Sequence, residues 1–344
     1  MALITAMTAL EQKDYPHISI IILTYNGAGF ILPLLESLSE QTYPLNLVEI
    51  VVIDNASTDN TLQLIQDNYK SVRIVPLEEN IGFAAGNNQG FLHARHDLLV
   101  FLNQDTICHP DFLKALVCKM LEDKSLAACN PNIIPVKPSH TDVTEYKLKI
   151  HSLHLCDLSP YGYGCNRIIS EKKFFYTKLL SGCAFIIRRA VIKNLGYLYD
   201  DLLWMYAEDT DLSLRIHRSG LKLGVMRDAI IFHLHGRSQA LKRSSLSLAA
   251  RAIMNRVYVF FKNMKTLEFL LFYPFLLLGG NFKIFEFSMP LIKKIVYFIP
   301  FSLFSMVCML SASFRLQRFT SKRRQILSNR YQKDFSILKL VLKI

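Results

Sequence analysis

The sequence lacks the marks of several protein classes. Its seven cysteines are odd in number and scattered, with no Cys-x-x-Cys pair, which argues against a disulfide framework and favours a reducing compartment. The first residues, MALITAMTALEQKD, have no basic region ahead of an apolar run, so we expect no secretory signal peptide. No glycine-rich phosphate loop such as Gly-x-Gly-x-Arg follows the first apolar run, which argues against a nucleotidyltransferase.

Acidic residues are scarce in the last third of the chain. Residues 236–344 carry 19 Lys and Arg but only Glu268, Glu286 and Asp334, a net charge of +16, whereas residues 1–235 have a net charge of −4. A basic region can bind nucleic acid or an anionic membrane surface. Because long apolar runs interrupt this region, it favours a membrane surface and no nucleic-acid partner. A solvated basic face is the alternative.

Two uncharged segments lie within this basic region. The first, residues 269–282, has 14 residues, and the second, residues 295–314, has 20; a membrane span needs about 20. Basic residues flank both segments, so both outer ends are expected on the cytoplasmic side of the membrane, as a helical hairpin or as peripheral interfacial helices. We therefore predict a basic, helical, membrane-associating tail over 237–344. The alternative is that these helices pack on the globular part of the chain or on a second copy in a homo-oligomer.

Strand-like and helix-like patterns alternate through the first part of the chain. Apolar, β-branched runs predict buried strands at 18–24, 47–54, 72–76 and 98–102. Helical spacing follows each of them, with Ser57 or Thr58 as a cap for the second helix and Pro110 opening the helix after the fourth strand. Residues 204–220 predict a loop leading into a further helix, and 179–189, 221–226 and 229–235 return to strand character.

This alternation predicts an α/β fold with a mostly parallel central sheet and helices on both faces. We place it over residues 18–236, after a leader at 1–17, with an irregular insertion at 131–175 to which we assign no chemistry.

Polar residues follow three of the predicted strands. Parallel sheets bind ligands beyond the carboxyl ends of their strands, so these residues predict one shared site, although each group alone suits an ordinary turn. They are Thr24, Tyr25 and Asn26 after the first strand, Asp54 and Asn55 after the second, and Asn103, Gln104 and Asp105 after the fourth.

Two further groups can carry chemistry. Asp105, with Asn103 beside it, is our candidate ligand for a divalent metal, Mg²⁺ or Mn²⁺, and His233 or His235 can join it; a histidine ligand favours Mn²⁺. Glu208, Asp209 and Asp211 cluster where a helix begins, and a carboxylate there can serve as a general base. The alternatives are a histidine of purely structural role and acidic residues favoured by the helix dipole.

As a set, the motifs ISIIILTYNG, VVIDNASTDNT, ENIGFAAGNNQG, LNQDT, EDTDLSLR and HLHG resemble glycosyltransferase family 2. Within it they are similar to the rhamnosyltransferase and galactofuranosyltransferase branch, over residues 17–236. The resemblance implies a GT-A fold, a dTDP- or UDP-sugar donor and an inverting single displacement. It also implies a glycan or lipid-linked glycan acceptor, in the assembly of cell-surface polysaccharide or lipopolysaccharide.

The resemblance also implies a role for each matching residue. Thr24, Tyr25 and Asn26 flank the nucleoside, Asp54 binds a uracil or thymine base, and Asn80 lies against the ribose or donor sugar. Asp105 is the last aspartate of the metal motif, His233 the metal-side histidine, Asp209 the catalytic base with Glu208 beside it, and Trp204 a neighbour of the acceptor. The chain departs from the stricter motif at Asn103, which replaces an aspartate and removes one negative charge from the metal site. Rival functions are a polyprenyl-phosphate sugar transferase and a catalytically silent donor-binding partner.

Overall fold

The structure is a computed structural model that describes residues 15–136, 153–158, 164–169, 172–234, 245–282, single positions between 303 and 313, and residues 315–328 and 336–342. Most of the predicted leader, much of the 131–175 segment, His235 and most of the second uncharged segment (295–314) lie outside these residues.

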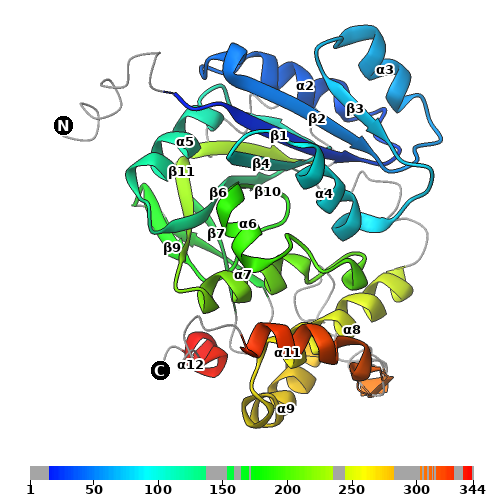
Figure 1. Cartoon of the computed structure of the whole chain (residues 1–344), viewed down its shortest axis with the longest axis vertical. Helices are drawn as coiled ribbons and strands as arrows, with labels where there is room; N and C mark the ends of the chain where they lie inside the picture. The colour runs from blue at the N-terminus through cyan, green and yellow to red at the C-terminus, as the bar shows by residue number, and fades with distance from the viewer. Residues whose placement is uncertain are drawn as a thin grey trace, which may run out of the picture.

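The strands of the sheet domain form one mixed sheet in the order β3-β2-β1-β4-β10-β6-β11-β5, with β9 paired to β11 (Figure 1). Strands β1, β2, β3 and β4 run parallel, as predicted, while β10 runs antiparallel to both of its neighbours. The strands are β1 (Ile18–Thr24), β2 (Val48–Asp54), β3 (Arg73–Pro76), β4 (Leu98–Asn103), β5 (Thr106–Cys108), β6 (Leu126–Pro135), β9 (Phe174–Thr177), β10 (Ala184–Arg188) and β11 (Lys222–His233).

Helices cover both faces of this sheet. Strand β1 shows why: Ile20 and Ile22 pack in one buried cluster with α2 and α5, whereas Ile21, which points to the opposite face, packs in a second cluster with α4, α6 and α7. Gly90 of α4 lies directly on Ile21, so this helix approaches the sheet closely. The helices are α2 (Ile31–Ser39), α3 (Thr61–Asn68), α4 (Gly82–His93), α5 (Phe112–Glu122), α6 (Arg189–Leu195) and α7 (Glu208–Arg218).

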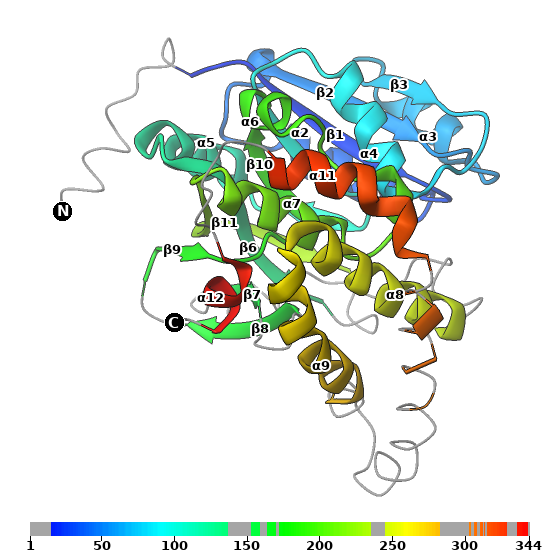
Figure 2. The ribbon, with the colours of Figure 1, turned by 60° about the horizontal axis from the view of Figure 1, so that its bottom comes forward.

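Three local predictions are wrong. Helix α3 is not capped by Ser57 or Thr58, because these residues contact Asn26 across the loop. The predicted strands 221–226 and 229–235 are one strand, β11, with a register irregularity between Met226 and Ile230. The 131–175 segment is not irregular throughout, since β6 continues to Pro135, β7 (Leu153–Leu158) and β8 (Gly164–Ile169) form a hairpin, and β9 follows (Figure 2).

Strand β6 lacks the apolar run that predicts a buried strand, because it buries polar side chains. Asn130 is 2% exposed. Its amide group exchanges hydrogen bonds with the backbone of Ser181, donating to the carbonyl at 3.0 Å and accepting from the N–H at 3.0 Å. Paired in this way, a buried amide costs little free energy.

The C-terminal helices pack against the sheet domain, below α7 in the view of Figure 1. Helix α8 contacts α7, and α11 in turn contacts α8. Their apolar side chains, among them Val257, Phe260 and Phe319, form a third buried cluster. These elements are α8 (Ser245–Asn263), α9 (Thr266–Phe282), the short helix η7 (Leu316–Phe319), α11 (Thr320–Ser328) and α12 (Ile337–Leu342). In the first uncharged segment, Phe269 and Phe272 of α9 belong to the same cluster as Leu203 and Leu214 of the sheet domain, so this side of α9 packs on the globular part, as in the alternative.

A buried ionic network joins these helices to the sheet domain. The ammonium of Lys262 in α8 lies 2.6 Å from a carboxylate oxygen of Asp200 and 2.9 Å from one of Asp211, and all three side chains are fully buried. Burial alone would raise the pKa of Asp211, but Lys262 and Arg215 outweigh it and hold that pKa at about 2. Removing one partner of such a network costs about 3–5 kcal/mol.

Within the part of the chain that the structure describes, no helix is both long and apolar enough to cross a membrane. Helix α9 nonetheless leaves Leu267, Leu270, Leu271 and Phe275 exposed, while Phe269 and Phe272 on its other side are buried.

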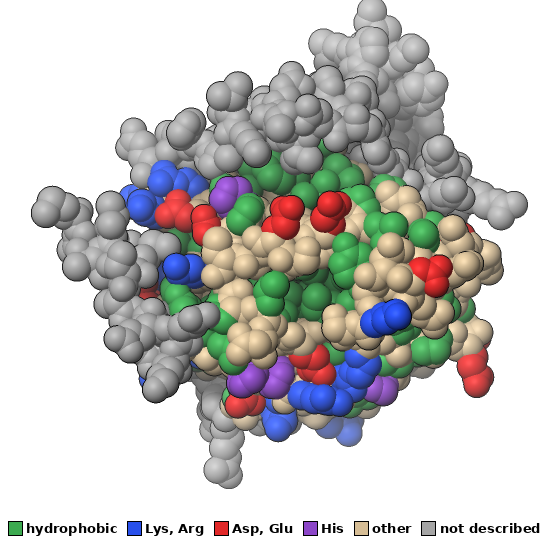
Figure 3. Space-filling view, turned by 90° about the horizontal axis from the view of Figure 1, so that it is seen from above, with side chains coloured by type: hydrophobic (Ala, Val, Ile, Leu, Met, Phe, Trp, Pro, Cys, Tyr) green, Lys and Arg blue, Asp and Glu red, His purple; other side chains and the backbone are tan. Residues whose placement is uncertain are grey.

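On the face of the sheet domain seen from above, acidic and basic side chains are interspersed (Figure 3).

Candidate functional site

A cleft opens at the carboxyl ends of β1 and β4, where the sequence predicts a site. Parallel pairing sets Thr24 beside Asp54 and Leu23 beside Asn103. The cleft encloses about 350 Å³, which is within the range of pockets for small organic ligands. It is lined by Leu23, Thr24, Tyr25, Asn55, Asn80, Phe83, Asn103, Gln104, Asp105, Trp204 and Met205.

Gln104 holds the ends of β1 and β4 together. Its carbonyl oxygen accepts hydrogen bonds from the Thr24 hydroxyl at 2.6 Å and the Tyr25 N–H at 2.9 Å, and its amide donates to the Tyr25 carbonyl at 3.2 Å. The predicted convergence of these two polar groups is therefore present. The sequence alone marks Gln104 only as a strand-end residue, with no role of its own.

Asp54 is buried just behind the cleft, 1% exposed. One of its carboxylate oxygens accepts from the Ser57 N–H at 3.0 Å, and the other is buried without a hydrogen-bond partner among the described residues. A buried carboxylate oxygen without a hydrogen bond destabilises the fold, and a donor group on a bound ligand would remove that penalty.

Asn80 and Asn26 differ in their relation to the cleft. Asn80 lines the cleft, and its carbonyl oxygen accepts from the side chain of Asn55 and from the Gly82 N–H, both at 3.0 Å. Asn26 has a positive φ of 50° and accepts from the Thr58 N–H at 2.8 Å. Asn26 is not among the cleft-lining residues, so its contacts are those of a residue that braces the neighbouring turn.

Asp105 and His233 form a pair at the edge of the cleft. Strands β5 and β11 set Thr106 opposite His233, and the Leu234 N–H donates to the Asp105 carbonyl at 2.9 Å. His233 Nε2 consequently lies 3.2 Å from an Asp105 carboxylate oxygen. Burial opposes a charge on His233, but Cys183 and Asp105 outweigh it and raise the pKa of His233 to about 10.

The Asp105–His233 pair fits a divalent metal in part. Two neighbouring ligands of an octahedral ion lie about 3 Å apart when each bond is about 2.1 Å, and the donor atoms here are 3.2 Å apart. A carboxylate with an imidazole suits Mn²⁺. Among the described residues no third His, Cys, Asp or Glu completes a metal-binding group, so the remaining ligands would have to come from a bound substrate or water.

Glu208 and Asp209 begin helix α7 with different environments. Glu208 is buried, and burial followed by the nearby charge of Asp209 raises its pKa to about 8. Asp209 is partly exposed; its carboxylate accepts from the Thr210 N–H at 2.6 Å and the Gly182 N–H at 3.3 Å, although burial raises its pKa as well. The next residue after Gly182, Cys183, accepts from the Asn103 N–H at 2.8 Å. The 182–183 segment therefore connects Asp209 to the end of β4.

Trp204 forms one wall of the cleft in an uncommon backbone conformation. Trp204, Tyr206 and Ala207 all have positive φ, at 57°, 73° and 67°; such residues are costly unless their surroundings fix them. The Trp204 ring packs onto Gly82, where a side chain would collide with it, and the Ala84 N–H donates to the Trp204 carbonyl at 3.0 Å. This strained run leads directly into Glu208.

Asn255 of α8 fixes that run. Its side-chain amide nitrogen lies within donating distance of three backbone carbonyls, 2.7 Å from Leu203, 2.9 Å from Met205 and 3.0 Å from Tyr206. Asn255 is 4% exposed. We did not predict this residue, because nothing in its local sequence distinguishes it from other polar residues of an amphipathic helix.

The comparisons with known proteins agree on one family. The family model for "Glycosyl transferase family 2" matches residues 19–196, just over half of the chain. The probable glycosyltransferase YdaM of Bacillus subtilis is 24% identical over 64% of this chain and 51% of that protein. The poly-beta-1,6-N-acetyl-D-glucosamine synthase of Staphylococcus epidermidis is 24% identical over 60% of this chain and 47% of that protein. The chain thus spans about half the length of these relatives.

A solved structure supports the fold. GalNAc-T7, crystallised with UDP, GalNAc and Mn²⁺, superimposes with a TM-score of 0.58 at 18% identity, covering 75% of this chain and 53% of that chain. At this identity the similarity concerns the fold, and it confirms the predicted GT-A arrangement.

We predict that Asn255→Leu loosens the run before Glu208. The carbonyls of Leu203, Met205 and Tyr206 lose their contact with the Asn255 amide, which costs about 1–3 kcal/mol, so backbone amides of residues 203–207 should exchange with deuterium about tenfold faster or more. Hydrogen-exchange mass spectrometry of a peptide covering 200–210 measures this. Asn68→Leu, which changes an exposed asparagine of α3, is the matched control. Unchanged exchange at 203–207 in Asn255→Leu would show that the run keeps its shape without this side chain.

Proposed function

The chain belongs to glycosyltransferase family 2, and we propose that it transfers a sugar from a nucleotide-diphospho-sugar to an acceptor hydroxyl with inversion. The observation that carries the proposal is the juxtaposition of the Asp105–His233 pair with Asp209, which the 182–183 segment links to the end of β4. The named synthase among its relatives makes a polysaccharide, which favours a role in cell-surface polysaccharide or lipopolysaccharide assembly. A rhamnosyl- or galactofuranosyltransferase branch is part of the same proposal.

The nucleoside end of the donor binds at β1 and β2. The unpartnered carboxylate oxygen of Asp54 can accept from the N3–H that uracil and thymine share, which favours a UDP- or dTDP-sugar. Thr24 and Tyr25 line the cleft next to it, and Asn80 lies where the ribose or donor sugar would follow. Asn26 contributes through the turn that it braces.

Asp105 and His233 are the proposed ligands of Mg²⁺ or Mn²⁺, with Asn103 as a neutral neighbour. A divalent cation bound there would neutralise the negative charge that develops on a diphosphate leaving group. Its ligand set here carries only one negative charge from the protein, so we expect the donor diphosphate to complete the site and metal affinity to depend on bound nucleotide.

Asp209 is the proposed general base. Glu208 is buried and its pKa of about 8 keeps it protonated at neutral pH, so the negative charge of the pair resides on Asp209. Hydrogen bonds from the Thr210 and Gly182 N–H groups favour that ionised form. Trp204, on the wall of the cleft, is placed to contact an acceptor sugar whose hydroxyl Asp209 deprotonates.

Asp209→Asn tests the base. Turnover, measured as UDP or dTDP release from a panel of candidate sugar nucleotides, should fall by about 100-fold or more, because general-base catalysis is lost. UDP affinity by calorimetry should stay within about twofold of wild type. Retained turnover in this variant would remove Asp209 from the role. Absence of turnover with every donor in the wild-type protein, while UDP still binds, would support a catalytically silent donor-binding partner instead.

Asp105→Asn tests the metal. Wild-type protein should bind UDP at least about tenfold more tightly with Mn²⁺ than with EDTA, and more tightly than GDP in both conditions. The variant should lose the gain from Mn²⁺ and keep the preference for UDP, because only the metal ligand has changed. Asp67→Asn, on α3 and remote from the cleft, is the control. Equal UDP affinity with and without Mn²⁺ in the wild-type protein contradicts metal dependence.

We also propose that the chain works at the cytoplasmic surface of a membrane through helix α9. Leu267, Leu270, Leu271 and Phe275 form an exposed apolar side on this helix, and the surrounding region is strongly basic. Apolar burial and attraction to anionic lipids act together in interfacial helices. A homo-oligomer that covers the same side is the rival explanation.

Replacing Leu270 and Leu271 together by Glu should separate these explanations. Binding to phosphatidylglycerol vesicles, measured by co-sedimentation, should fall by about fivefold or more, since charged side chains resist entry into the bilayer. Leu45→Glu, an exposed leucine of the sheet domain, should bind vesicles as wild type does. If vesicle binding is unchanged while light scattering shows a loss of dimer, α9 covers a second copy and not a membrane.

A further inference from the structure

A second pocket adjoins the cleft. It encloses about 380 Å³ between one side of α8 and the short helix η7. The two cavities meet at Trp204: its ring lines the cleft, and the guanidinium of Arg251, which lines the second pocket, lies 4.6 Å over that ring. The lining residues are Leu202, Ala250, Arg251, Met254, Asn255, Tyr258, Arg315 and Phe319.

The charge of this pocket is of one sign. Arg251 and Arg315 both line it, both are exposed, and no Asp or Glu lines it. Within the part of the chain that the structure describes, neither guanidinium forms an ion pair with a carboxylate. Two arginines at one cavity make a strong site for a phosphate group, because the guanidinium fork matches phosphate oxygens.

Apart from Asn255, whose side-chain amide contacts the backbone of 203–206, the rest of the lining is mainly apolar. Met254 and Leu202 present aliphatic surface, and the rings of Tyr258 and Phe319 stack with centroids 4.4 Å apart. Burying a hydrocarbon chain against such a surface is favourable. The pocket therefore matches a ligand with a phosphate head and an apolar chain.

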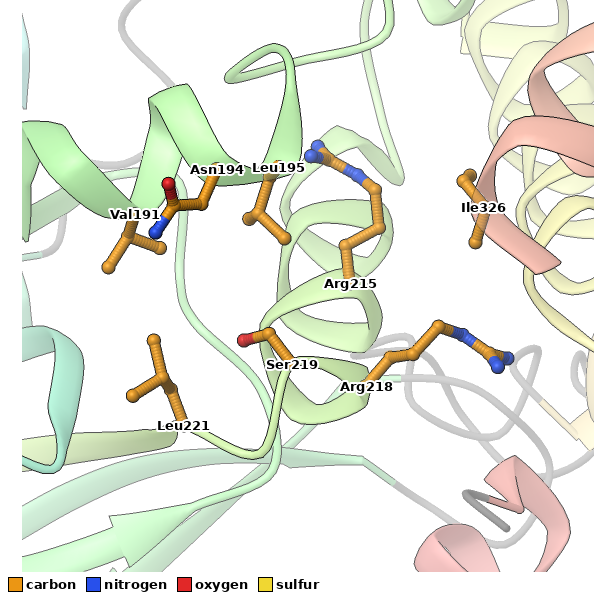
Figure 4. A pocket seen from close by; sticks show the side chains of 8 residues that line it. All are labelled: Val191, Asn194, Leu195, Arg215, Arg218, Ser219, Leu221 and Ile326. Atoms are coloured by element: carbon orange, nitrogen blue, oxygen red, sulfur yellow. The ribbon is translucent and has the colours of Figure 1, made fainter. Parts of the chain in front are cut away.

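Another arginine-lined cavity shows the contrast. It encloses about 230 Å³ between α6, α7 and α11 (Figure 4). The guanidinium of its Arg215 is already bound by Asp211 and by the backbone carbonyls of Tyr197 and Leu198, and Arg218 donates to the Asn263 carbonyl. Those two guanidiniums are bound by a carboxylate or by backbone carbonyls, whereas neither Arg251 nor Arg315 has such a partner among the residues that the structure describes.

We propose that the second pocket is the acceptor subsite, and that it takes a lipid phosphate with the phosphate on Arg251 and Arg315 and the chain on Tyr258 and Phe319. This inference rests on the proposed function. It places the acceptor on the far side of Trp204, with its sugar passing that ring toward Asp209. The same α8 surface supplies Asn255, so the subsite and the run before Glu208 share one support.

Trp204 provides the measurement, because it is the only tryptophan in the chain. Decyl phosphate is titrated, below its micelle-forming concentration and in EDTA, into the full chain while Trp204 fluorescence is recorded; calorimetry gives an independent Kd. Wild-type protein should bind it saturably. Arg315→Gln, which leaves the Arg251–Trp204 contact in place, should weaken binding about tenfold or more. Arg324→Gln, an exposed arginine of α11 outside the pocket, should bind as wild type does.

Two neutral or chain-free probes complete the design. Decyl maltoside and glucose 6-phosphate should each bind at least about tenfold more weakly than decyl phosphate. Equal affinity for decyl maltoside, equal affinity for glucose 6-phosphate, or an unchanged Kd in Arg315→Gln each overturns the lipid-phosphate subsite. UDP affinity is measured in parallel in all variants. If decyl phosphate binds as expected while no sugar nucleotide binds or turns over, the subsite stands and the proposed transfer reaction fails.

Discussion

One buried ammonium group, that of Lys262, fixes the part of the molecule on which the candidate chemistry depends. Its two carboxylate partners, Asp200 and Asp211, bracket the 201–210 segment in the sequence. That segment contains Trp204, Glu208 and Asp209, so a single side chain on α8 holds both of its ends. Asn255 lies seven residues before Lys262, on the same side of the helix, and holds the middle of the segment. The α8 helix is therefore part of the site and not an appendage to it.

This arrangement explains how the chain tolerates strain next to Glu208. Non-glycine residues with positive φ cost about 1–3 kcal/mol each, and three of them occur between Trp204 and Ala207. The carbonyls of Leu203, Met205 and Tyr206 face the Asn255 amide of α8, so part of the support for this conformation comes from outside the segment. A buried ion network, whose disruption costs about 3–5 kcal/mol, and the Asn255 amide together over-determine the conformation. The same strain turns the Trp204 ring onto Gly82 and makes it a wall of the cleft.

The sequence allowed prediction wherever one local pattern decides the outcome. Strands β1, β2 and β4 are mostly apolar runs, and β3 is marked by its Ile-Val pair. The polar residues after β1 and β4 converge as the parallel arrangement requires. Prediction from the sequence failed where contacts between residues far apart in the chain determine the structure. Strand β6 buries Asn130 against Ser181, a contact that no local pattern announces. In the sequence Lys262 is one of 19 basic residues of the last third of the chain, yet it is fully buried, because Asp200 and Asp211, more than fifty residues earlier, pair with it. Asn255 escaped notice for the same reason.

The two acidic residues at the start of α7 show how burial divides roles between chemically similar groups. Both carboxyls sit at a helix N-terminus, which favours negative charge, but two adjacent charges in a buried setting repel each other. Glu208 has a buried oxygen without a partner and a pKa of about 8, so it is the group that keeps a proton. The Asp209 carboxylate accepts hydrogen bonds from the N–H groups of Gly182 and Thr210, and its side chain remains partly exposed to solvent. Because Glu208 directly follows the segment held by Lys262 and Asn255, the proposed division of roles between the two carboxylates depends on the support from α8.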